Sequence, residues 1–439
     1  MKYYSTNGKA PLADLKKAVV KGLAEDRGLY MPEKIYQLPK AFFDDMKNMS
    51  FQDIAYNVAS NFFGEDVDAD ALQDLVYDTL SFDCPIVKVE DNIYSLELFH
   101  GPTLAFKDVG ARFMARLLRY FTSQKSNNGL INVLVATSGD TGSAVANGFL
   151  GVEGIHVYVL YPKGKVSPIQ ECQFTTLGKN ITAIEVDGVF DDCQALVKSA
   201  FMDEELNRHM MLTSANSINV ARFLPQAFYY FNAYARMKQL SNSEIVKSSN
   251  IVMCVPSGNF GNICAALFGH EMGLPIKRFI AANNANDVFY EYLQTGKYNP
   301  RPSVQTLANA MDVGAPSNFA RIYDLYGKSH ERISSLISGA TYTDEQIADT
   351  MRRCYKETGY VLDPHGACGY QALKDGLKPD EIGIFCETAH PAKFKEKVDA
   401  ILSTDIEIPA RLQAFMKGQK QSVPMTKNFQ DFKAYLMQQ

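Results

Sequence analysis

Apolar residues recur at helical spacing along the first ninety residues of the chain. One such pattern is followed by Gly28, a residue type common just beyond helix ends, and two further patterns come before Pro85. We therefore expect a helical N-terminal domain over residues 1–90, placed so that it could cover an active site. The three patterns are Leu12, Leu15, Val19 and Leu23, then residues 51–63, then residues 69–80.

Beyond Pro85 the pattern changes to short β-branched runs that alternate with amphipathic segments. Runs of this kind, separated by helices, predict parallel sheets that are covered by helices on both faces. The fold class expected is therefore α/β. The predicted strands are residues 93–98, 131–136, 157–161, 181–186, 251–255 and 382–386, and the predicted helices are residues 109–121 and 190–201.

The two parallel-sheet domains are expected to be interleaved along the chain. The larger domain takes residues 91–125 and 220–439, and the smaller one takes residues 126–219. The polar stretch Ser241 to Asn250 is interpreted as a loop. Residues 286–345 are rich in Asn, Pro, Ser and Gly and receive no assignment.

Charge and cysteine content narrow the function classes. The net charge of −5 over 439 residues gives no basis for binding nucleic acid or an anionic membrane. No apolar run approaches the length of a membrane span, and the N-terminus lacks the apolar core of a signal peptide. Eight cysteines occur without a C-x-x-C pair, and the seven histidines form no zinc pattern. We expect a cytoplasmic protein with reduced cysteines and no metal site.

One lysine stands in unusual surroundings. Lys107 follows Leu104, Ala105 and Phe106 and precedes Val109, where a helix is expected to begin. An amine among apolar side chains is desolvated, which lowers its pKa and favours the nucleophilic free base. Such amines form Schiff bases with carbonyl compounds, including pyridoxal phosphate. The alternative is a lysine whose stem packs while its head reaches water, which is the commoner case for a single lysine.

Two glycine-rich turns follow predicted strands and lead into predicted helices. The first is Ser138-Gly-Asp-Thr-Gly142 and the second is Ser257-Gly-Asn-Phe-Gly-Asn262. Unpaired backbone N–H groups and the helix dipole make such a turn an anion site, and glycine permits close approach and positive φ. Either turn alone often does no more than connect a strand to a helix. Together they predict two anions at the carboxyl ends of the strands, such as a phosphorylated cofactor and an anionic substrate.

These segments also resemble a known family. His100-Gly-Pro-Thr-Leu-Ala-Phe-Lys-Asp108 and the two turns are similar to the signature blocks of the threonine synthase family, which belongs to the fold type II (tryptophan-synthase-β-like) pyridoxal-phosphate enzymes. Leu212 to Asn219, Asn309-Ala-Met-Asp-Val313 and Glu387 to Phe394 add to the resemblance. It extends from about residue 3 to residue 402, and the last thirty-odd residues match poorly.

The resemblance implies a role for each matching residue. Lys107 would carry the Schiff base with the cofactor pyridoxal 5′-phosphate, and Thr388 would face the pyridine nitrogen, although it could also be a helix N-cap before Pro391. The cofactor phosphate would be held by Gly258, Asn259, Phe260, Gly261 and Asn262, and Asn259 would also reach the ring hydroxyl. The substrate α-carboxylate would be bound by Ser138, Gly139, Asp140 and Thr141. The substrate phosphate would be bound by Ser214, Asn216, Ser217, Asn219 and Arg222, with Lys163 or Lys165.

The implied reaction is conversion of O-phospho-L-homoserine and water to L-threonine and phosphate by a monomer or homodimer. Three alternatives stay open at this point. One is another fold type II enzyme, either a threonine or serine dehydratase or a phosphohomoserine phospho-lyase. The others are a catalytically silent protein that binds pyridoxal phosphate, which would not need Lys107, and a phosphate-binding module without a cofactor.

Overall fold

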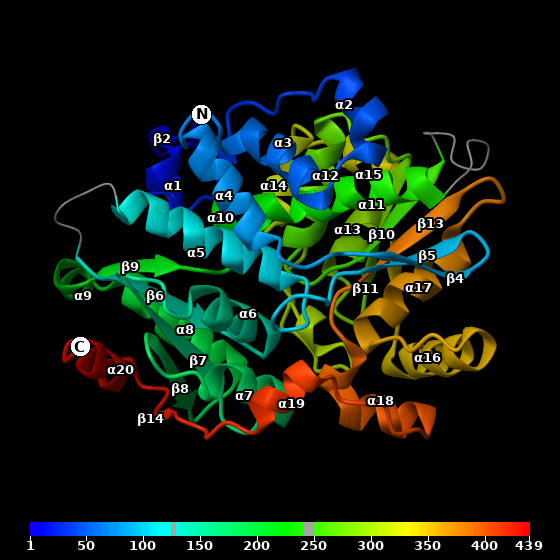
Figure 1. Cartoon of the computed structure of the whole chain (residues 1–439). Coiled ribbons are helices and arrows are strands. Elements are labelled where there is room, and N and C mark those ends of the chain that lie inside the picture. The colour runs from blue at the N-terminus through cyan, green and yellow to red at the C-terminus, as the bar shows by residue number, and fades with distance from the viewer. Residues whose placement is uncertain (124–128, 241–249) are drawn as a thin grey trace.

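The computed structural model describes residues 1–123, 129–240 and 250–439 (Figure 1). Within them the chain forms an α/β structure with two mainly parallel sheets and a small antiparallel sheet near the N-terminus. The loop expected at 241–250 lies almost wholly outside the described residues, and so does the expected domain boundary between residues 125 and 126.

The N-terminal region contains the expected helices and, in addition, three short strands that the periodicity does not reveal. The prediction that Leu12 lies in the first helix is wrong, because Leu12 is 53% exposed and precedes that helix. The helix begins after Asp14, whose side chain caps it by accepting from the Lys17 N–H. The helix ends at Gly22, whose φ is 73°, and not near Gly28. The elements are β1 (Lys2–Ser5), β2 (Ala13–Asp14), α1 (Leu15–Lys21), β3 (Tyr30–Pro32), α2 (Lys40–Asp45), η1 (Met46–Asn48), α3 (Phe51–Phe63) and α4 (Ala69–Thr79).

The larger sheet has the strand order β12-β11-β10-β13-β5-β4, and all its pairs are parallel except β4 with β5. Strand β4 lies within the range expected for the N-terminal domain, so that boundary is set too late. The strands are β4 (Ile86–Glu90), β5 (Ile93–Glu97), β10 (Ile251–Pro256), β11 (Arg278–Asn283), β12 (Ile337–Thr341) and β13 (Ile382–Glu387).

The helices that lie in residues 107–123 and 220–402 are grouped here with the larger sheet. Residues 286–345, which the sequence leaves unassigned, contribute three α-helices and β12. The helices are α5 (Lys107–Ser123), α10 (Val220–Phe223), η2 (Leu224–Gln226), α11 (Ala227–Leu240), α12 (Gly261–Glu271), α13 (Val288–Thr295), η3 (Asn309–Met311), α14 (Phe319–Leu325), α15 (His330–Leu336), α16 (Asp344–Thr358), α17 (Pro364–Gly376), η4 (Pro391–Phe394) and α18 (Lys395–Leu402).

The smaller sheet has the order β14-β8-β7-β6-β9, and every pair in it is parallel. Its edge strand β14 comes from residues that were expected in the larger domain, which corrects that assignment. The division into domains otherwise stays a prediction. The elements are β6 (Ile131–Ala136), α6 (Asp140–Phe149), β7 (Ile155–Pro162), α7 (Pro168–Thr175), β8 (Ile181–Val186), α8 (Phe190–Met202), α9 (Glu204–His209), β9 (Met211–Ser214), α19 (Ala410–Met416), β14 (Val423–Met425) and α20 (Phe429–Leu436).

Alternating residues of each central strand enter different cores, as expected for strands buried on both faces. In β6, Val133 and Val135 join the central core with the N-terminal helices, whereas Leu134 packs with α8 and α20 on the outer face. In β10, Met253 joins the central core and Cys254 packs with α17. The central core therefore fixes the two sheets and the N-terminal helices relative to one another.

Both glycine turns lie where the sequence places them, at the carboxyl ends of β6 and β10 and directly before α6 and α12. Among the described residues no helix is long and apolar enough to cross a membrane. All eight cysteines are free, and seven are buried.

Candidate active site

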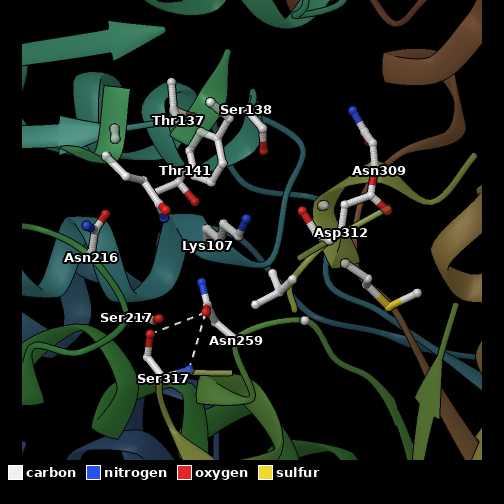
Figure 2. A pocket seen from close by; sticks show the side chains of 18 of the residues that line it. Lys107, Thr137, Ser138, Thr141, Asn216, Ser217, Asn259, Asn309, Asp312 and Ser317 are labelled. Atoms are coloured by element: carbon white, nitrogen blue, oxygen red, sulfur yellow. Dashed lines mark hydrogen bonds between the residues drawn. The ribbon is translucent and has the colours of Figure 1, made fainter. Parts of the chain in front are cut away.

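A cavity of about 2170 Å³ lies between the carboxyl ends of the two sheets and receives residues from both, and from the chain around α1 (Figure 2). It brings together most of the residues predicted from the sequence. Gly139, Asp140, Lys163 and Asn219 are not part of its lining. The predicted residues that line it are Lys107, Ser138, Thr141, Lys165, Ser214, Asn216, Ser217, Arg222, Gly258, Asn259, Phe260, Gly261, Asn262 and Thr388.

The turn before Lys107 is held on two sides. The Asp108 carboxylate accepts hydrogen bonds from the Thr103 N–H (2.9 Å) and from the Thr103 hydroxyl (2.6 Å). On the other side, the Phe106 N–H donates to the Thr388 carbonyl at 2.8 Å, and the His390 N–H donates to the Leu104 carbonyl at 3.1 Å. Lys107 then begins α5, and its amine points into the cavity (Figure 2).

Burial lowers the pKa of Lys107 to about 8. The Asp140 carboxylate acts in the opposite direction, and the cations Arg222 and Lys393 reinforce the lowering. About a tenth of the Lys107 amine is therefore the free base near neutral pH, far more than for an ordinary lysine, as the apolar sequence around it predicts.

The second glycine turn presents backbone N–H groups to the cavity. Its shape is fixed from within, because the Asn262 amide donates to the Pro256 carbonyl at 2.8 Å and accepts from the Ser257 hydroxyl at 3.0 Å. Within the described residues, the N–H groups of residues 258–262 donate to no protein acceptor. A Cβ at Gly258 would lie 2.9 Å from the Ala310 carbonyl oxygen, so the glycine is needed for close approach.

The expectation of positive φ at the glycines of this turn is wrong. The left-handed residue is Phe260, with φ 64° and ψ 13°, and its ring packs on Phe289 with the centroids 4.5 Å apart. Asn259 accepts weak hydrogen bonds from the Ser317 hydroxyl and N–H, at 3.4 and 3.5 Å (Figure 2). The open amides of this turn make it the better of the two anion cradles.

The first glycine turn contains a buried ion pair. Asp140 lies 2.6 Å from the Lys393 amine and accepts from the Gln170 amide at 2.9 Å, so its carboxylate is held by two residues that themselves line the cavity. Burial alone would raise the pKa of Asp140, but Lys393 and Lys107 lower it to about 2. The N–H groups of Gly139 and Gly142 are occupied by the Thr137 hydroxyl. The side chains of Ser138 and Thr141 remain on the cavity (Figure 2).

The segment from Ser214 to Arg222 divides into ligand-facing and structural residues. Asn219 is fully buried, caps α10 by accepting from the Ala221 N–H, and donates to the Val19 carbonyl at 2.8 Å. Arg222 is 2% exposed and donates to the Ala215 carbonyl, and no described carboxylate forms an ion pair with it. Burial lowers the pKa of this guanidinium to about 10. An unpaired buried cation beside a cavity suits a phosphate ligand.

Thr388 lines the cavity directly after β13, and it is not a helix cap. The N-cap of η4 is His390, whose ring accepts from the Ala392 N–H at 3.0 Å. The preceding residue, Glu387, is fully buried. Burial and the nearby Asp363 carboxyl raise the pKa of Glu387 well above its ordinary value. The residue at the cavity wall is therefore an uncharged hydroxyl, and the buried acid next to it in the chain has a raised pKa.

Several lining residues have no role assigned from the sequence. Lys393, which pairs with Asp140, lies within residues 387–394, and Asn309 and Asp312 lie within residues 309–313. Both segments carry the family resemblance, but the resemblance assigns these three residues no role. Asp312 is held by the Thr306 hydroxyl at 2.7 Å and the Asn284 amide at 2.9 Å. Lys21 and Arg27 reach the cavity from the N-terminal region, where the sequence shows no chemical signal. This placement supports the expectation that the N-terminal region covers the site.

Comparison with known proteins covers the whole chain. Residues 80–385 match the family described as pyridoxal-phosphate dependent enzyme, residues 2–80 match the threonine synthase N terminus, and residues 366–436 match the C-terminal part of threonine synthase. A threonine synthase from Haemophilus influenzae is 43% identical over 437 residues, covering 100% of both chains.

Two solved structures are similar over nearly the full length. The crystal structure of threonine synthase from Escherichia coli has a TM-score of 0.91 and 41% identity, covering 100% of both chains. The structure of pyridoxal-phosphate-bound threonine synthase from Brucella melitensis has a TM-score of 0.92 and 33% identity, covering 100% of this chain and 99% of that one. The expectation that the resemblance ends near residue 402 is therefore wrong.

Proposed function

Because this chain belongs to the threonine synthase family of pyridoxal-phosphate-dependent enzymes, we propose that it converts O-phospho-L-homoserine and water to L-threonine and phosphate in the cavity around Lys107. One observation carries this proposal. A lysine with a lowered pKa and two glycine turns at strand ends line the same cavity, so one amine and two anion sites are within reach of one small molecule and its cofactor.

The second turn and its surroundings fit pyridoxal 5′-phosphate. The cofactor phosphate would accept from the N–H groups of residues 258–262, which supports the assignment because these groups have no described protein acceptor. The Asn259 side chain would reach the ring hydroxyl, and Thr388 would face the pyridine nitrogen. A hydroxyl there cannot stabilise a protonated pyridinium as a carboxylate would. When bound, the cofactor supplies an electron sink for negative charge on the carbon atoms of the amino acid.

The first turn would bind the substrate α-carboxylate through Ser138, Thr141 and the backbone N–H of Asp140, and not through Gly139, because the Gly139 N–H already donates to the Thr137 hydroxyl. A free carboxylate at Asp140 would repel that anion. Its ion pair with Lys393 removes most of the repulsion, which supports the assignment. The other end of the substrate would meet Ser214, Asn216, Ser217, Arg222 and Lys165, where hydroxyls, an amide and two cations suit a phosphate dianion.

Lys107 would move the protons of the reaction. Its desolvated amine takes the proton from the α-carbon of the bound substrate, passes it on, and then takes one from Cβ, after which phosphate leaves from Cγ. Lys107 then gives a proton to Cγ, which becomes the methyl group of threonine. Water adds at Cβ and loses a proton, and a proton is returned to the α-carbon. The N-terminal residues that cover the site keep water away from the reacting atoms until water is needed at Cβ. Water that entered earlier would divert the reaction to other products.

Assembly and location are also proposals. We propose a monomer or homodimer in the cytoplasm. Eight free cysteines, most of them buried, support a reducing compartment.

The test of this function is a product assay on phosphohomoserine. We expect phosphate and threonine in equal amounts and little 2-oxobutanoate when threonine is the only substrate. Phosphate release with 2-oxobutanoate in place of threonine would identify a phospho-lyase. Rapid deamination of threonine would identify a dehydratase, and either result would overturn the proposal.

A further inference from the structure

The C-terminal residues 403–439 run from the helices of the larger sheet to the smaller sheet. After α18 the chain passes through α19, which packs on α7, and then adds β14 to β8 (Figure 1). It ends in α20, whose Phe432 and Leu436 are fully buried in the outer core of the smaller sheet. The segment is therefore anchored at both ends, and its middle spans the two sheets.

In its middle the segment contacts the turn that precedes Lys107. The Arg411 guanidinium donates to the His100 carbonyl at 3.0 Å and to the Gly101 carbonyl at 2.6 Å. The next residue, Leu412, is fully buried in a small apolar cluster that is separate from the main cores. That cluster contains Leu104, Ala392 and Leu412, with Ile169, Ile406 and Ile408 packed around them.

This cluster joins the turn, α7 and the C-terminal segment in one place, and α7 also reaches the turn directly, because the Gln173 amide donates to the Thr103 carbonyl at 3.0 Å. Leu104 belongs to the turn before Lys107, Ile169 belongs to α7 beside the smaller sheet, and Leu412 comes from the C-terminal segment. Movement of α7 relative to the larger sheet would therefore act on Leu104 through this packing.

The backbone at Leu104 needs such support. Its φ is 57°, in the left-handed region that is unfavourable for a branched side chain, so the conformation persists only where the surroundings fix it. The turn is closed by the Leu104 N–H, which donates to the Gly101 carbonyl at 3.2 Å. Arg411 donates to the same carbonyl oxygen, so one acceptor is shared by the closing bond of the turn and by the C-terminal segment.

We propose that residues 406–412 form a strap that fixes the turn 101–104 and makes the placement of Lys107 depend on the position of the smaller sheet, with Arg411 and Leu412 as positioning residues. This inference rests on the proposed role of Lys107 as the lysine that holds the cofactor. Neither residue lines the cavity, so both act through the turn and not on the substrate.

The alternative is that the strap only adds stability, and the titration of Lys107 distinguishes the two. Burial holds the pKa of Lys107 at about 8, so a relaxed turn that exposes the amine to water moves this pKa upward, toward its ordinary value. Loss of stability alone would leave the titration of the folded protein unchanged.

The experiment uses the full-length protein with Arg411→Ala, Arg411→Lys, Leu412→Ala and Leu412→Met. Lys433→Ala is the matched control, because Lys433 is a cation on the same C-terminal segment whose ion-pair partners, Asp203 and Glu205, lie at the start of α9 and not on α7 or the turn. For each variant, cofactor-free protein is mixed with pyridoxal phosphate, and the rate of forming the borohydride-reducible bond is followed against pH. The thermal unfolding midpoint, kcat and KM are measured beside it.

We expect Arg411→Ala and Leu412→Ala to raise the pH midpoint by about half a unit or more, and to lower kcat several-fold while KM stays within about twofold. Arg411→Lys and Leu412→Met should recover much of the loss, and Lys433→Ala should behave as the unaltered protein. If Leu412→Ala does not fold, the exposed Arg411 variants decide the question.

An unchanged pH midpoint in Arg411→Ala, or an equal shift in Lys433→Ala, would overturn the strap. Borohydride labelling of the unaltered protein distinguishes an error in the strap proposal from an error in the assignment of Lys107. A label on another lysine would show that Lys107 does not hold the cofactor, and both proposals would then be wrong.

Discussion

The two glycine turns share a position in the fold but use different chemistry. Each follows a central parallel strand and opens a helix, at β6–α6 and at β10–α12. The turn at 257–262 contains no charged residue, and the N–H groups of its residues 258–262 have no described protein acceptor. The turn at 138–142 has two of its N–H groups occupied by Thr137 and contains the Asp140–Lys393 ion pair, 2.6 Å in length.

This difference shows that a strand, a glycine turn and a helix do not by themselves define what is bound. A bare cradle of N–H groups suits a phosphate that stays in place through every turnover. A turn that offers two hydroxyls, next to an acid whose charge is balanced by a lysine, suits a ligand that must enter and leave in each turnover. Four changes test this contrast.

The largest effect is expected at the ion pair of the first turn. Asp140→Asn or Lys393→Met leaves one buried charge without its partner, and each should lower the free energy of unfolding by about 3–5 kcal/mol. The double variant Asp140→Asn/Lys393→Met should recover most of that loss, as urea unfolding can measure. Losses that simply add in the double variant would contradict the pairing.

The next effect is expected at the second turn. A valine at Gly258 places its Cβ 2.9 Å from the Ala310 carbonyl oxygen and the Met311 Cα, which narrows the cradle. Gly258→Val should weaken cofactor affinity about 100-fold, equal to about 2.7 kcal/mol, as equilibrium dialysis can measure. Gly129→Val is the control, since a Cβ there meets no described atom within 4 Å. Equal cofactor retention in both variants would place the phosphate elsewhere.

A smaller and more selective effect is expected from the hydroxyls of the first turn. Ser138→Ala should raise KM for phosphohomoserine about tenfold, because one hydrogen bond to a charged group contributes about 1.5 kcal/mol. Steady-state kinetics and a cofactor titration together check this. Cofactor affinity should not change, and a parallel loss of cofactor affinity would show that the two turns do not serve separate ligands.

The smallest effect concerns the pH dependence of Lys107. Its amine reacts only as the free base, so the rate of cofactor capture should rise with pH and level off above a midpoint of about 8. Asp140 raises this pKa and Lys393 lowers it. The double variant that removes both charges should therefore shift the midpoint by less than about half a unit. A midpoint near 10 in the unaltered protein would contradict the desolvated environment.

Local patterns are enough to predict β5, β6, β7, β8, β10 and β13 and the position of both turns, whereas β4, β9, β11 and β12 are not among the predicted strands. β6 and β8 occupy the predicted residues without change, because continuous β-branched runs bounded by turns have few alternatives. The short strands β1 to β3 are not predicted, since two to four residues carry too little periodicity. Strand β14 is likewise missed, and its sheet partner β8 lies more than two hundred residues earlier.

The site is predictable only as far as its motifs are contiguous. Lys107, Thr388 and residues 258–262 lie in such motifs and meet in one cavity. Pairings across the chain leave no sequence signal, and Lys393 with Asp140 or Arg411 with Gly101 are of this kind. Asn219 shows the opposite error, because a polar residue inside a ligand motif is used to cap a helix.

The most direct test of this account is to locate the lysine that binds the cofactor. The purified protein is reduced with borohydride, digested, and mapped for the pyridoxyl group by mass spectrometry. The account predicts the group on Lys107 alone, and loss of the label with retained folding in Lys107→Ala. A pyridoxyl group on Lys393, Lys165 or any other lysine would contradict it.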